Sequence, residues 1–430
     1  MLRLKTTDPD FAKKFQRIVE DRRESGENLA RTVADILDAV RRKGDEALQE
    51  MTARYDSHFL TADLASWRVS PDECELAYLA LDANLRQALD LAAERIRTYH
   101  QSQLPADRDF TDEAGVRLGA RWRAVDAAGL YVPGGRASYP SSLLMTAIPA
   151  KVAGVERLAV VTPTPKGATN PLVLAAAHIA GIDEIWRVGG AQALAALAYG
   201  TQRIKPVDVI VGPGNAYVAE AKRQLYGVVG IDMVAGPSEI LVIADGKNDP
   251  DWIAADLLSQ AEHDPSAQSI LITDDPLFAE QVEDRVDVQC SSLATRRTAR
   301  ASWDDHGVLL VVSDMAEAPA LANRLAAEHV ELAVDDPEAM FAQIRHAGSV
   351  FLGRHTPEAV GDYIAGPNHV LPTGRRARFS SGLSVLDFMK RTSFIAMDCG
   401  ALARIGPAAI ALATAEGLPA HAQSVKVRLK

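Results

Sequence analysis

From Gly129 onwards the sequence alternates short apolar stretches with segments of helical periodicity, and this alternation restricts the chain to few folds. The stretches GLYV, RLAVV, EIW and VDVIV are separated by segments such as PLVLAAAHIAG, and a second series contains EILVIAD, SILITDD, VLLVVSD, ELAVDD and SVFLG. Alternating strands and helices are joined by right-handed crossovers into mostly parallel sheets. The sequence therefore predicts an α/β protein with two Rossmann-like, doubly wound domains. Two such units suggest a duplication, although no repeat of residues proves it.

The two ends of the chain are predicted to form small helical segments. Leu29, Val33 and Val40 recur at helical spacing, and the chain after Gly382 also reads as helical. We expect four parts. Residues 28–130 and 238–382 form a first α/β domain with most metal and catalytic residues, and residues 131–237 form a second domain on the cofactor side. Residues 1–27 and 383–408 form a small helical domain, and residues 409–430 form a C-terminal tail. Such a tail is too short to bury a core of its own, so it must dock on this subunit or on a partner.

The charge of the chain excludes some partners. The 430 residues carry a formal net charge of -11, and a field of this sign repels nucleic-acid phosphates. We therefore expect no nucleic-acid partner. Arg375, Arg376 and Arg378 form a local basic group, which we interpret as a solvated loop.

No segment predicts export or insertion into a membrane. The first residues, MLRLKTTDPDFAKKF, lack the apolar core of a signal peptide, and no stretch approaches the roughly 20 apolar residues of a membrane span. We expect a cytoplasmic protein without membrane contacts. Its cysteines, Cys74, Cys290 and Cys399, lie far apart with no CxxC spacing, so a bound metal would need nitrogen and oxygen ligands.

Three glycine-rich turns follow predicted strands, namely VPGG at 132–135, VGG at 188–190 and VGPGN at 211–215. Open α/β sheets bind ligands at the carboxyl ends of their strands, where backbone amides can approach a phosphate. None of the turns is GxGxxG, so a nucleotide site and plain tight turns are equally supported. Tyr131, Gln192 and Asn215 lie on or beside these turns and can hydrogen-bond a cofactor.

A predicted helix carries the first half of a candidate metal site. Asp249 is suited to its N-cap and Pro250 to its first turn. Gln260 and His263 lie three positions apart near its end, where residues at this spacing share one face. A glutamine and a histidine so placed are more often ordinary surface residues, so further ligands must support a metal site.

Those further ligands occur later in the chain. Asp362 and His369 lie in GDYIAGPNHVLP, while Glu416 and His421 lie in AEGLPAHAQ near the C-terminus. Carboxylate and imidazole groups are oxygen and nitrogen ligands of the kind that zinc accepts. The sequence thus favours a metal site assembled from distant segments.

Glu328 and His329 stand in LAAEHVEL, where a predicted helix gives way to a strand. Neighbouring residues that leave a helix point in different directions, so this acid and this imidazole can take two distinct proton-transfer roles. The alternative is a histidine that interacts only with the last carbonyls of the helix.

Taken in order, these segments resemble the histidinol dehydrogenase family over nearly the whole chain. The resemblance rests on GLYVPGG, VGGAQALAALAYGT, VGPGNAYVAEAKR, AGPSEILVIAD, DLLSQAEHD, AAEHVEL, GDYIAGPNHVLPT, FSSGLSVLDFMKRTS and AEGLPAHAQSVKVRL. It implies an NAD-dependent, zinc-requiring, four-electron oxidation of L-histidinol to L-histidine through L-histidinaldehyde, the last step of histidine biosynthesis. The one departure is LAAEHVEL, where relatives usually read PEHL; it leaves the acid and imidazole in place.

The resemblance also implies roles for the candidate residues. One zinc ion per subunit would be held by Gln260, His263, Asp362 and His421. The substrate would contact Ser238, Gln260, His263, His329, Asp362, His369, Glu416 and His421. Tyr131, Gln192 and Asn215 would line the NAD site. The family further implies an intertwined homodimer, in which we expect Glu416 and His421 to complete the partner's site.

In this interpretation His329 takes the hydroxyl proton of the substrate and Glu328 activates the water that attacks the aldehyde. A cysteine-linked intermediate is disfavoured because no cysteine lies in a matched motif. Two alternatives stay open. The first is a related zinc and NAD dehydrogenase acting on another small polar alcohol, such as a sulfopropanediol. The second is a zinc-binding protein without turnover.

Overall fold

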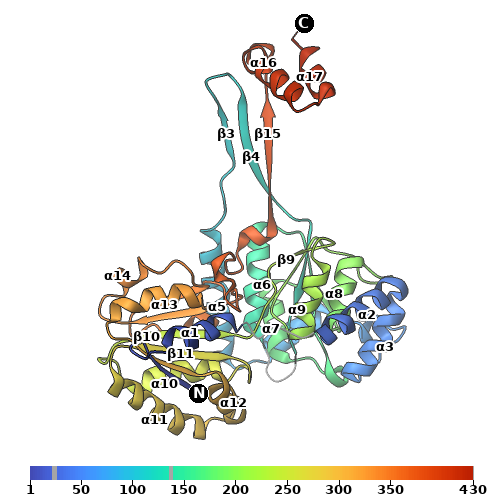
Figure 1. The fold of residues 1–430 in the computed structure, drawn as a ribbon. Coiled ribbons are helices and arrows are strands. Elements are labelled where there is room, and N and C mark those ends of the chain that lie inside the picture. The colour runs from blue at the N-terminus through green and yellow to red at the C-terminus, as the bar shows by residue number, and fades with distance from the viewer. Residues whose placement is uncertain (22–26, 135–138, 430) are drawn as a thin grey trace.

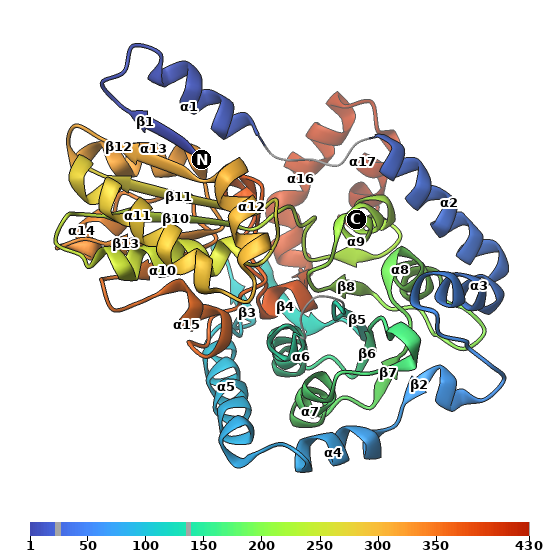
Figure 2. The same cartoon turned by 90° about the horizontal axis from the view of Figure 1, so that it is seen from below.

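A computed structural model describes residues 1–21, 27–134 and 139–429 of the chain. It consists of two α/β units, each built on a six-stranded sheet, and a long three-stranded sheet that projects from them (Figure 1). Seen from below, the two α/β units lie side by side (Figure 2). Gly135, the last residue of the first predicted glycine-rich turn, lies outside the described residues.

The first sheet, called sheet A, is parallel throughout. Its order is β1 (Leu2–Lys5), β12 (Val308–Val311), β11 (Gln268–Thr273), β10 (Glu239–Ala244), β13 (His329–Ala333) and β14 (Ser349–Leu352). Alternate residues of its strands enter two separate apolar cores. Leu241 and Ile243 enter the core on one face, and Ile240 and Val242 enter the core on the other. Such two-sided burial is the reason that the strands read as continuous apolar runs.

Helices cover both faces of sheet A. One face packs against α1 (Phe11–Glu20), α13 (Ala318–Leu325) and α14 (Pro337–Phe341), and the other against α10 (Pro250–Ala261), α11 (Pro276–Ser292) and α12 (Arg296–His306). The short helix α15 (Glu358–Tyr363) follows β14 and contacts α10.

The second sheet, called sheet B, is parallel except at one edge. Its order is β2 (Arg68–Val69), β7 (Glu184–Trp186), β6 (Arg157–Val161), β5 (Ala127–Tyr131), β8 (Val209–Val211) and β9 (Gly230–Ile231), with β2 antiparallel to β7. The two sheets share one strand order. In sheet A the strands β11 and β12 lie on one side of β10, and β13 and β14 lie on the other; in sheet B the strands β6 and β7 lie on one side of β5, and β8 and β9 lie on the other. This topology confirms the expected α/β fold with two doubly wound units.

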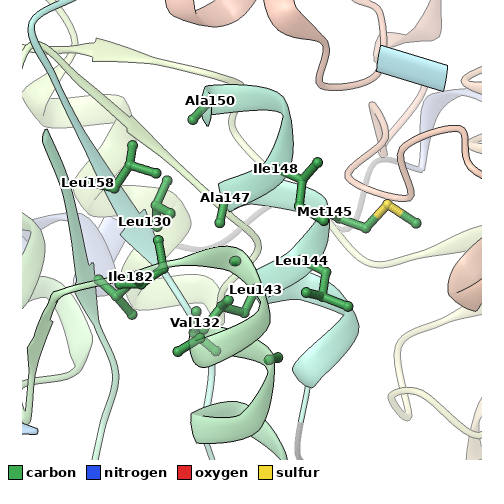
Figure 3. Close-up of a cluster of buried hydrophobic side chains, with 14 of the residues drawn as sticks. Leu130, Val132, Leu143, Leu144, Met145, Ala147, Ile148, Ala150, Leu158 and Ile182 are labelled. Carbon is green, nitrogen blue, oxygen red and sulfur yellow. The ribbon is translucent and has the colours of Figure 1, made fainter. Parts of the chain in front are cut away.

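Helices also cover both faces of sheet B. One face packs against α4 (Pro71–Leu79), α5 (Ala83–Gln101), α6 (Pro140–Ala153) and α7 (Pro171–Ala180), and the other against α2 (Glu27–Lys43), α3 (Asp45–Asp56), α8 (Gly190–Tyr199) and α9 (Ala216–Leu225). Figure 3 shows part of the first core, where Leu130 and Val132 lie near Leu143 and Ala147 of α6. These contacts fix β5, and with it the position of Tyr131 at its end.

The third sheet forms an antiparallel stalk. It contains β15 (Met389–Ala396), β4 (Arg117–Ala124) and β3 (Arg108–Thr111). Figure 1 shows α16 (Cys399–Ala415) and α17 (Pro419–Lys426) at its far end, away from both α/β units. The stalk and these two helices therefore stand apart from the body of their own chain.

The packing differs from the predicted division of the chain in three places. Residues 2–5 form an edge strand of sheet A, whereas we expected residues 1–27 to join 383–408 in a helical domain. Residues 28–130 do not join residues 238–382, because α2 to α5, β2 and β5 belong to the sheet B unit, while β3 and β4 belong to the stalk. Residues 389–396 form a strand. Edge strands and solvated ribbons bury few side chains, so their sequences carry no strong apolar period.

The basic group at Arg375 is not a solvated loop as a whole. Arg375 is 1% exposed and pairs with Glu239, although Arg378 is largely exposed. The three cysteines are free, with Cys74 and Cys290 buried and Cys399 exposed. In the described part of the chain, no helix is both long and apolar enough to cross a membrane.

Candidate active site

Most candidate catalytic and metal-binding residues gather at the amino ends of β10 and β13. His329 is the first residue of β13 and follows Glu328, while Ser238 directly precedes β10. A helix that follows a parallel strand runs back along the sheet, so the end of α10 returns to this edge with Gln260 and His263. The topology thus joins segments that are distant in the sequence.

The sequence signals for α10 are confirmed. Asp249 caps the helix by accepting a hydrogen bond from the Asp251 N–H (2.9 Å), and Pro250 is the first helical residue. Leu257 and Leu258 are buried against sheet A. Burial of this face fixes the rotation of the helix, which sets where its last turn presents Gln260 and His263.

The Asp362 carboxylate lies among three imidazoles. Its Oδ2 is 3.9 Å from Nε2 of His263, and its Oδ1 is 3.9 Å from Nε2 of His329 and from Nδ1 of His369. Ligand atoms of His329, Asp362 and Glu358 also lie within 4.8 Å of one another. A carboxylate in this position favours positive charge beside it, whether a protonated imidazole or a metal ion.

The hydrogen bond of His329 determines which ring nitrogen is free. Its Nδ1 is 3.1 Å from the carbonyl oxygen of Glu239. Because a carbonyl can only accept, Nδ1 carries the hydrogen and Nε2 keeps its lone pair. Nε2 faces Glu358 Oε1 at 3.5 Å. Burial lowers the pKa of His329 to about 4, opposed by the charge of Asp362, so the imidazole is a neutral group with a lone pair directed into the site.

Glu328 is held by the same peptide segment. Its Oε2 accepts a hydrogen bond from the Glu239 N–H (2.9 Å) and lies 3.8 Å from Nδ1 of His329. Burial raises the pKa of Glu328 well above its usual range, and the Glu239 N–H opposes this effect. A carboxyl group with a raised pKa is a stronger base once it is ionised, which suits it to proton transfer near neutral pH.

Gln260 provides a test of whether the site fits a cation. Its side chain is fully buried, and neither its amide oxygen nor its amide nitrogen has a hydrogen-bond partner among the described residues. Leaving a buried polar group unpaired costs about 1–3 kcal/mol. A metal ion bound to the amide oxygen would remove that cost for the oxygen, and the imidazole and carboxylate of His263 and Asp362 are ligands that Zn²⁺ accepts.

Sequence reasoning missed Glu358. It is 1% exposed, its Oε2 accepts a hydrogen bond from the Ser259 hydroxyl (3.1 Å), and burial raises its pKa, as does the charge of Asp362. The available signal was its position four residues before Asp362, since residues at this spacing share a helix face. Glu358 thus joins Asp362 as a second carboxyl group near Nε2 of His329.

His369 and Ser238 complete the body of the site. His369 Nδ1 donates to the carbonyl of Asp362 (2.8 Å), and its Nε2 lies 3.3 Å from the Ser142 hydroxyl. Burial lowers the pKa of His369. The carbonyl of Ser238 accepts a hydrogen bond from Gln268 (3.0 Å), which links the starts of β10 and β11.

The candidate cofactor residues lie on sheet B, at the carboxyl ends of its strands. The Tyr131 hydroxyl accepts a hydrogen bond from the Gly190 N–H (3.2 Å) at the start of α8, and burial raises the pKa of Tyr131 to about 12. Gln192 lies in the first turn of α8, and Asn215 caps α9. Helix N-termini present backbone N–H groups that suit a phosphate.

The structure of one chain does not bring Glu416 and His421 to the other candidates. Glu416 ends α16 and His421 lies in α17, and both side chains are exposed at the far end of the stalk (Figure 1). Within the described chain, these two residues therefore lie apart from the other candidates.

Comparisons with known proteins agree over the full length of the chain. The sequence model of the family described as histidinol dehydrogenase matches residues 19–429. Histidinol dehydrogenases from Zymomonas mobilis and Rhodospirillum rubrum are 60% and 61% identical over 429 residues, covering 100% of this chain and 99% and 98% of theirs. The crystal structure of histidinol dehydrogenase from Elizabethkingia anophelis matches with a TM-score of 0.94 at 36% identity, covering 100% of this chain and 98% of that one. The chain therefore belongs to the histidinol dehydrogenase family.

Proposed function

We propose that this protein oxidises L-histidinol to L-histidine through L-histidinaldehyde, with NAD as hydride acceptor and zinc as its metal, in the last step of histidine biosynthesis. The family supports the reaction. The observation that carries the proposal is the group of three imidazoles around Asp362, beside the buried pair Glu328 and His329. The alternatives, a dehydrogenase of another polar alcohol and a zinc protein without turnover, are not favoured, since full-length relatives are named histidinol dehydrogenase.

Gln260, His263 and Asp362 would hold one zinc ion per subunit, and His421 from a partner chain would add a fourth ligand. Glu358 is a further candidate, because it approaches the same centre. When bound, zinc would supply a Lewis acid that anchors the imidazole and amine nitrogens of the substrate. Asp362 and His369 would position the substrate between the metal ligands and His329, while Ser238 and Glu416 would offer polar contacts.

His329 would act as the base in the first oxidation. Its Nε2 lone pair can accept the hydroxyl proton as hydride leaves the carbinol carbon, which gives the aldehyde. The hydrogen bond from Nδ1 to Glu239 keeps the ring in the required tautomer. Because burial keeps the imidazole neutral, the base is already in its proton-accepting form at neutral pH.

Glu328 would act in the second oxidation. Its carboxylate can take a proton from water, and the resulting hydroxide oxygen adds to the aldehyde carbon to form a hydrate. Loss of a second hydride from this hydrate, together with loss of its hydroxyl proton to solvent, gives the carboxylate of L-histidine. The Glu239 N–H that binds Glu328 leaves the other carboxylate oxygen available for the water.

The two hydrides would pass to two NAD molecules in turn. Tyr131, Gln192 and Asn215 would bind NAD at the carboxyl edge of sheet B, with backbone N–H groups of α8 and α9 near its phosphates. The aldehyde must remain bound while NADH leaves and NAD replaces it. The buried polar residues around Asp362 would retain it during this exchange.

We propose a homodimer in which each tail completes the partner's site. Exposed apolar residues on α16 and after it, such as Leu412 (66% exposed) and Leu418 (42% exposed), support an association that covers them. Exposed apolar groups of this size gain free energy when another surface removes them from water. Cytoplasmic localisation stays a prediction.

The test is the number of NADH molecules formed per L-histidinol consumed, measured before and after a chelator removes metal and zinc is restored. Two NADH per substrate, lost and regained with the metal, is the expected result. One NADH per substrate would contradict the second oxidation. Absence of NADH from zinc-loaded protein would overturn the proposed reaction.

A further inference from the structure

Arg375 has an unusual environment for an arginine. It is 1% exposed, and its φ of +67° lies in the left-handed region that residues with a Cβ rarely adopt. Such strain persists where the surrounding structure holds the residue in place, and it gathers at functional positions. A strained and fully buried arginine therefore needs a reason beyond turn formation.

The Arg375 guanidinium joins two strands of sheet A and the helix α1 that packs on it. Its Nη1 pairs with Glu239 Oε1 at 3.0 Å, and its Nη2 donates to Gln268 Oε1 at 2.6 Å and to the carbonyl of Ile18 at 3.1 Å. Glu239 and Gln268 are the first residues of β10 and β11, and Ile18 lies in α1. Nearby, the Gly236 N–H donates to the Thr373 hydroxyl, so the segment around Arg375 supports the whole start of β10.

Both main-chain groups of Glu239 contact the proposed catalytic pair. Its N–H donates to Glu328 Oε2 at 2.9 Å, and its carbonyl accepts from His329 Nδ1 at 3.1 Å. The Glu239 side chain is fully buried and reaches Arg375 on its other side. One residue thus connects the buried arginine to the two groups that transfer protons.

We propose that Arg375 is a positioning residue, which acts through Glu239 to hold Glu328 and His329 in their working orientations. The inference rests on the proposed function of that pair. If the ion pair is lost, the start of β10 can shift, the Nδ1 hydrogen bond weakens, and His329 can adopt the tautomer whose Nε2 is blocked by hydrogen. Small displacements of reacting groups cost large factors in rate.

Arg375→Gly is the informative variant, because glycine accepts the positive φ without strain. We expect kcat to fall about 10- to 100-fold, with the KM values for L-histidinol and NAD changing less than kcat. Millimolar guanidinium, below unfolding concentrations, should restore part of kcat by filling the vacated space beside Glu239. The double variant Arg375→Gly with Glu239→Gln removes both buried charges, and it should fold but gain nothing from guanidinium.

Arg157→Gln is the matched control. Arg157 forms a comparable, partly buried pair with Glu184 (2.9 Å) at the start of β6, where it contacts no candidate catalytic residue. This variant should lower the melting temperature while leaving kcat unchanged. A loss of kcat shared equally by both variants would overturn the specific role of Arg375.

A measurement independent of turnover separates this inference from the proposed function. The Nδ1–H signal of His329 in ¹⁵N-histidine-labelled protein can be assigned by its absence in His329→Asn. Its weakening or faster exchange in folded Arg375→Gly, but not in Arg157→Gln, would support the inference even if wild-type protein made no NADH. An unchanged signal together with wild-type kcat would overturn it.

Discussion

Sheet A and sheet B share one strand order, yet their candidate residues lie at opposite ends of their strands. In sheet B, Tyr131 ends β5 and Asn215 follows β8, as is general for open α/β sheets. In sheet A, Glu239 and His329 begin their strands. One topology therefore supports two kinds of site, and the helix ends and loops around each sheet decide which edge is used.

The carboxyl edge of sheet A shows why its ligands gather elsewhere. A hollow of about 550 Å³ does lie there, lined by Asp245, Asp274 and Asp275 together with Lys247. Asp275 caps the N-terminus of α11 at this edge and Asp245 pairs with Arg354 (2.6 Å), whereas the corresponding edge of sheet B presents glycine-rich turns beside its helix N-termini. The amino edge of sheet A instead receives α10 and α15, which carry the metal-binding candidates.

The largest effect should come from the amino edge of sheet A. His329→Asn removes the proposed base, so turnover should fall by roughly 10² to 10⁴. Zinc content and the KM for NAD should stay near wild type, because this residue is assigned to neither role. Metal analysis and steady-state kinetics check both points. Loss of zinc in this variant would contradict the separation of proton transfer from metal binding.

The carboxyl edge of sheet B should respond to Gly212→Ala. Gly212 has a φ of +115°, and a Cβ there would lie 2.3 Å from the carbonyl oxygen of Tyr131. The two strand ends must then separate, and a loss of about 1.4 kcal/mol in NAD binding raises its KM roughly tenfold. Gly227→Ala is the control, since Gly227 also has a positive φ, +101°, but no atom within 4 Å of its Cβ position. Equal KM values in both variants would refute the effect.

The tail can be tested by mixing two inactive chains, His329→Ala and His421→Ala. If His421 acts in the partner's site, each mixed dimer holds one site with both histidines intact. When equal amounts of the two chains pair at random, half of the dimers are mixed, and each mixed dimer has one working site out of two. About a quarter of wild-type activity should therefore return in a two-fold symmetric dimer. Activity is measured after the chains are unfolded and refolded together. No recovery would place His421 in the site of its own chain, against the position of α17 at the end of the stalk.

A smaller effect concerns the buried carboxyl groups of sheet A in metal-free protein. Burial raises the pKa of Glu358 to about 8, so the folded state holds this proton more tightly than the unfolded state does. The resulting stabilisation is complete at a pH below the usual pKa of glutamate and is lost as the pH rises towards 8. Glu358→Gln should flatten that decline by up to about 1.4 kcal/mol per pH unit. Urea unfolding across this pH range measures it, with Glu338→Gln on the surface as control. An unchanged slope would contradict the raised pKa.

Sequence predicted the regular parts of the molecule well. The strands of both sheets are apolar because two layers of helices bury them, and α10 is fixed by Asp249 and Pro250 at its start. The position of Glu328 and His329 at the start of a strand was also predicted, and α13 ends at Leu325 just before them. Periodicity and capping are local signals, so they can be recognised in the sequence without knowledge of the fold.

Long-range packing was the part that sequence could not provide. Glu358 and Arg375 are charged residues, which are usually exposed, and only the approach of other segments makes them buried. The four residues of β1 pair with a strand 306 positions later, a contact that leaves no local pattern. Motifs were enough to name the candidate residues. Only the coordinates show that most of them form one site in the body of the chain, while Glu416 and His421 lie at the far end of the stalk.

The stalk has a consequence for how activity returns after unfolding. β15 has eight residues and spans about 26 Å, which carries the tail well beyond the surface of its own subunit. If the tail serves a partner, each chain can regain its helices alone, but a working site must await a collision between two chains. Recovery of activity after denaturation should therefore depend on protein concentration, while recovery of the helical signal in circular dichroism should not.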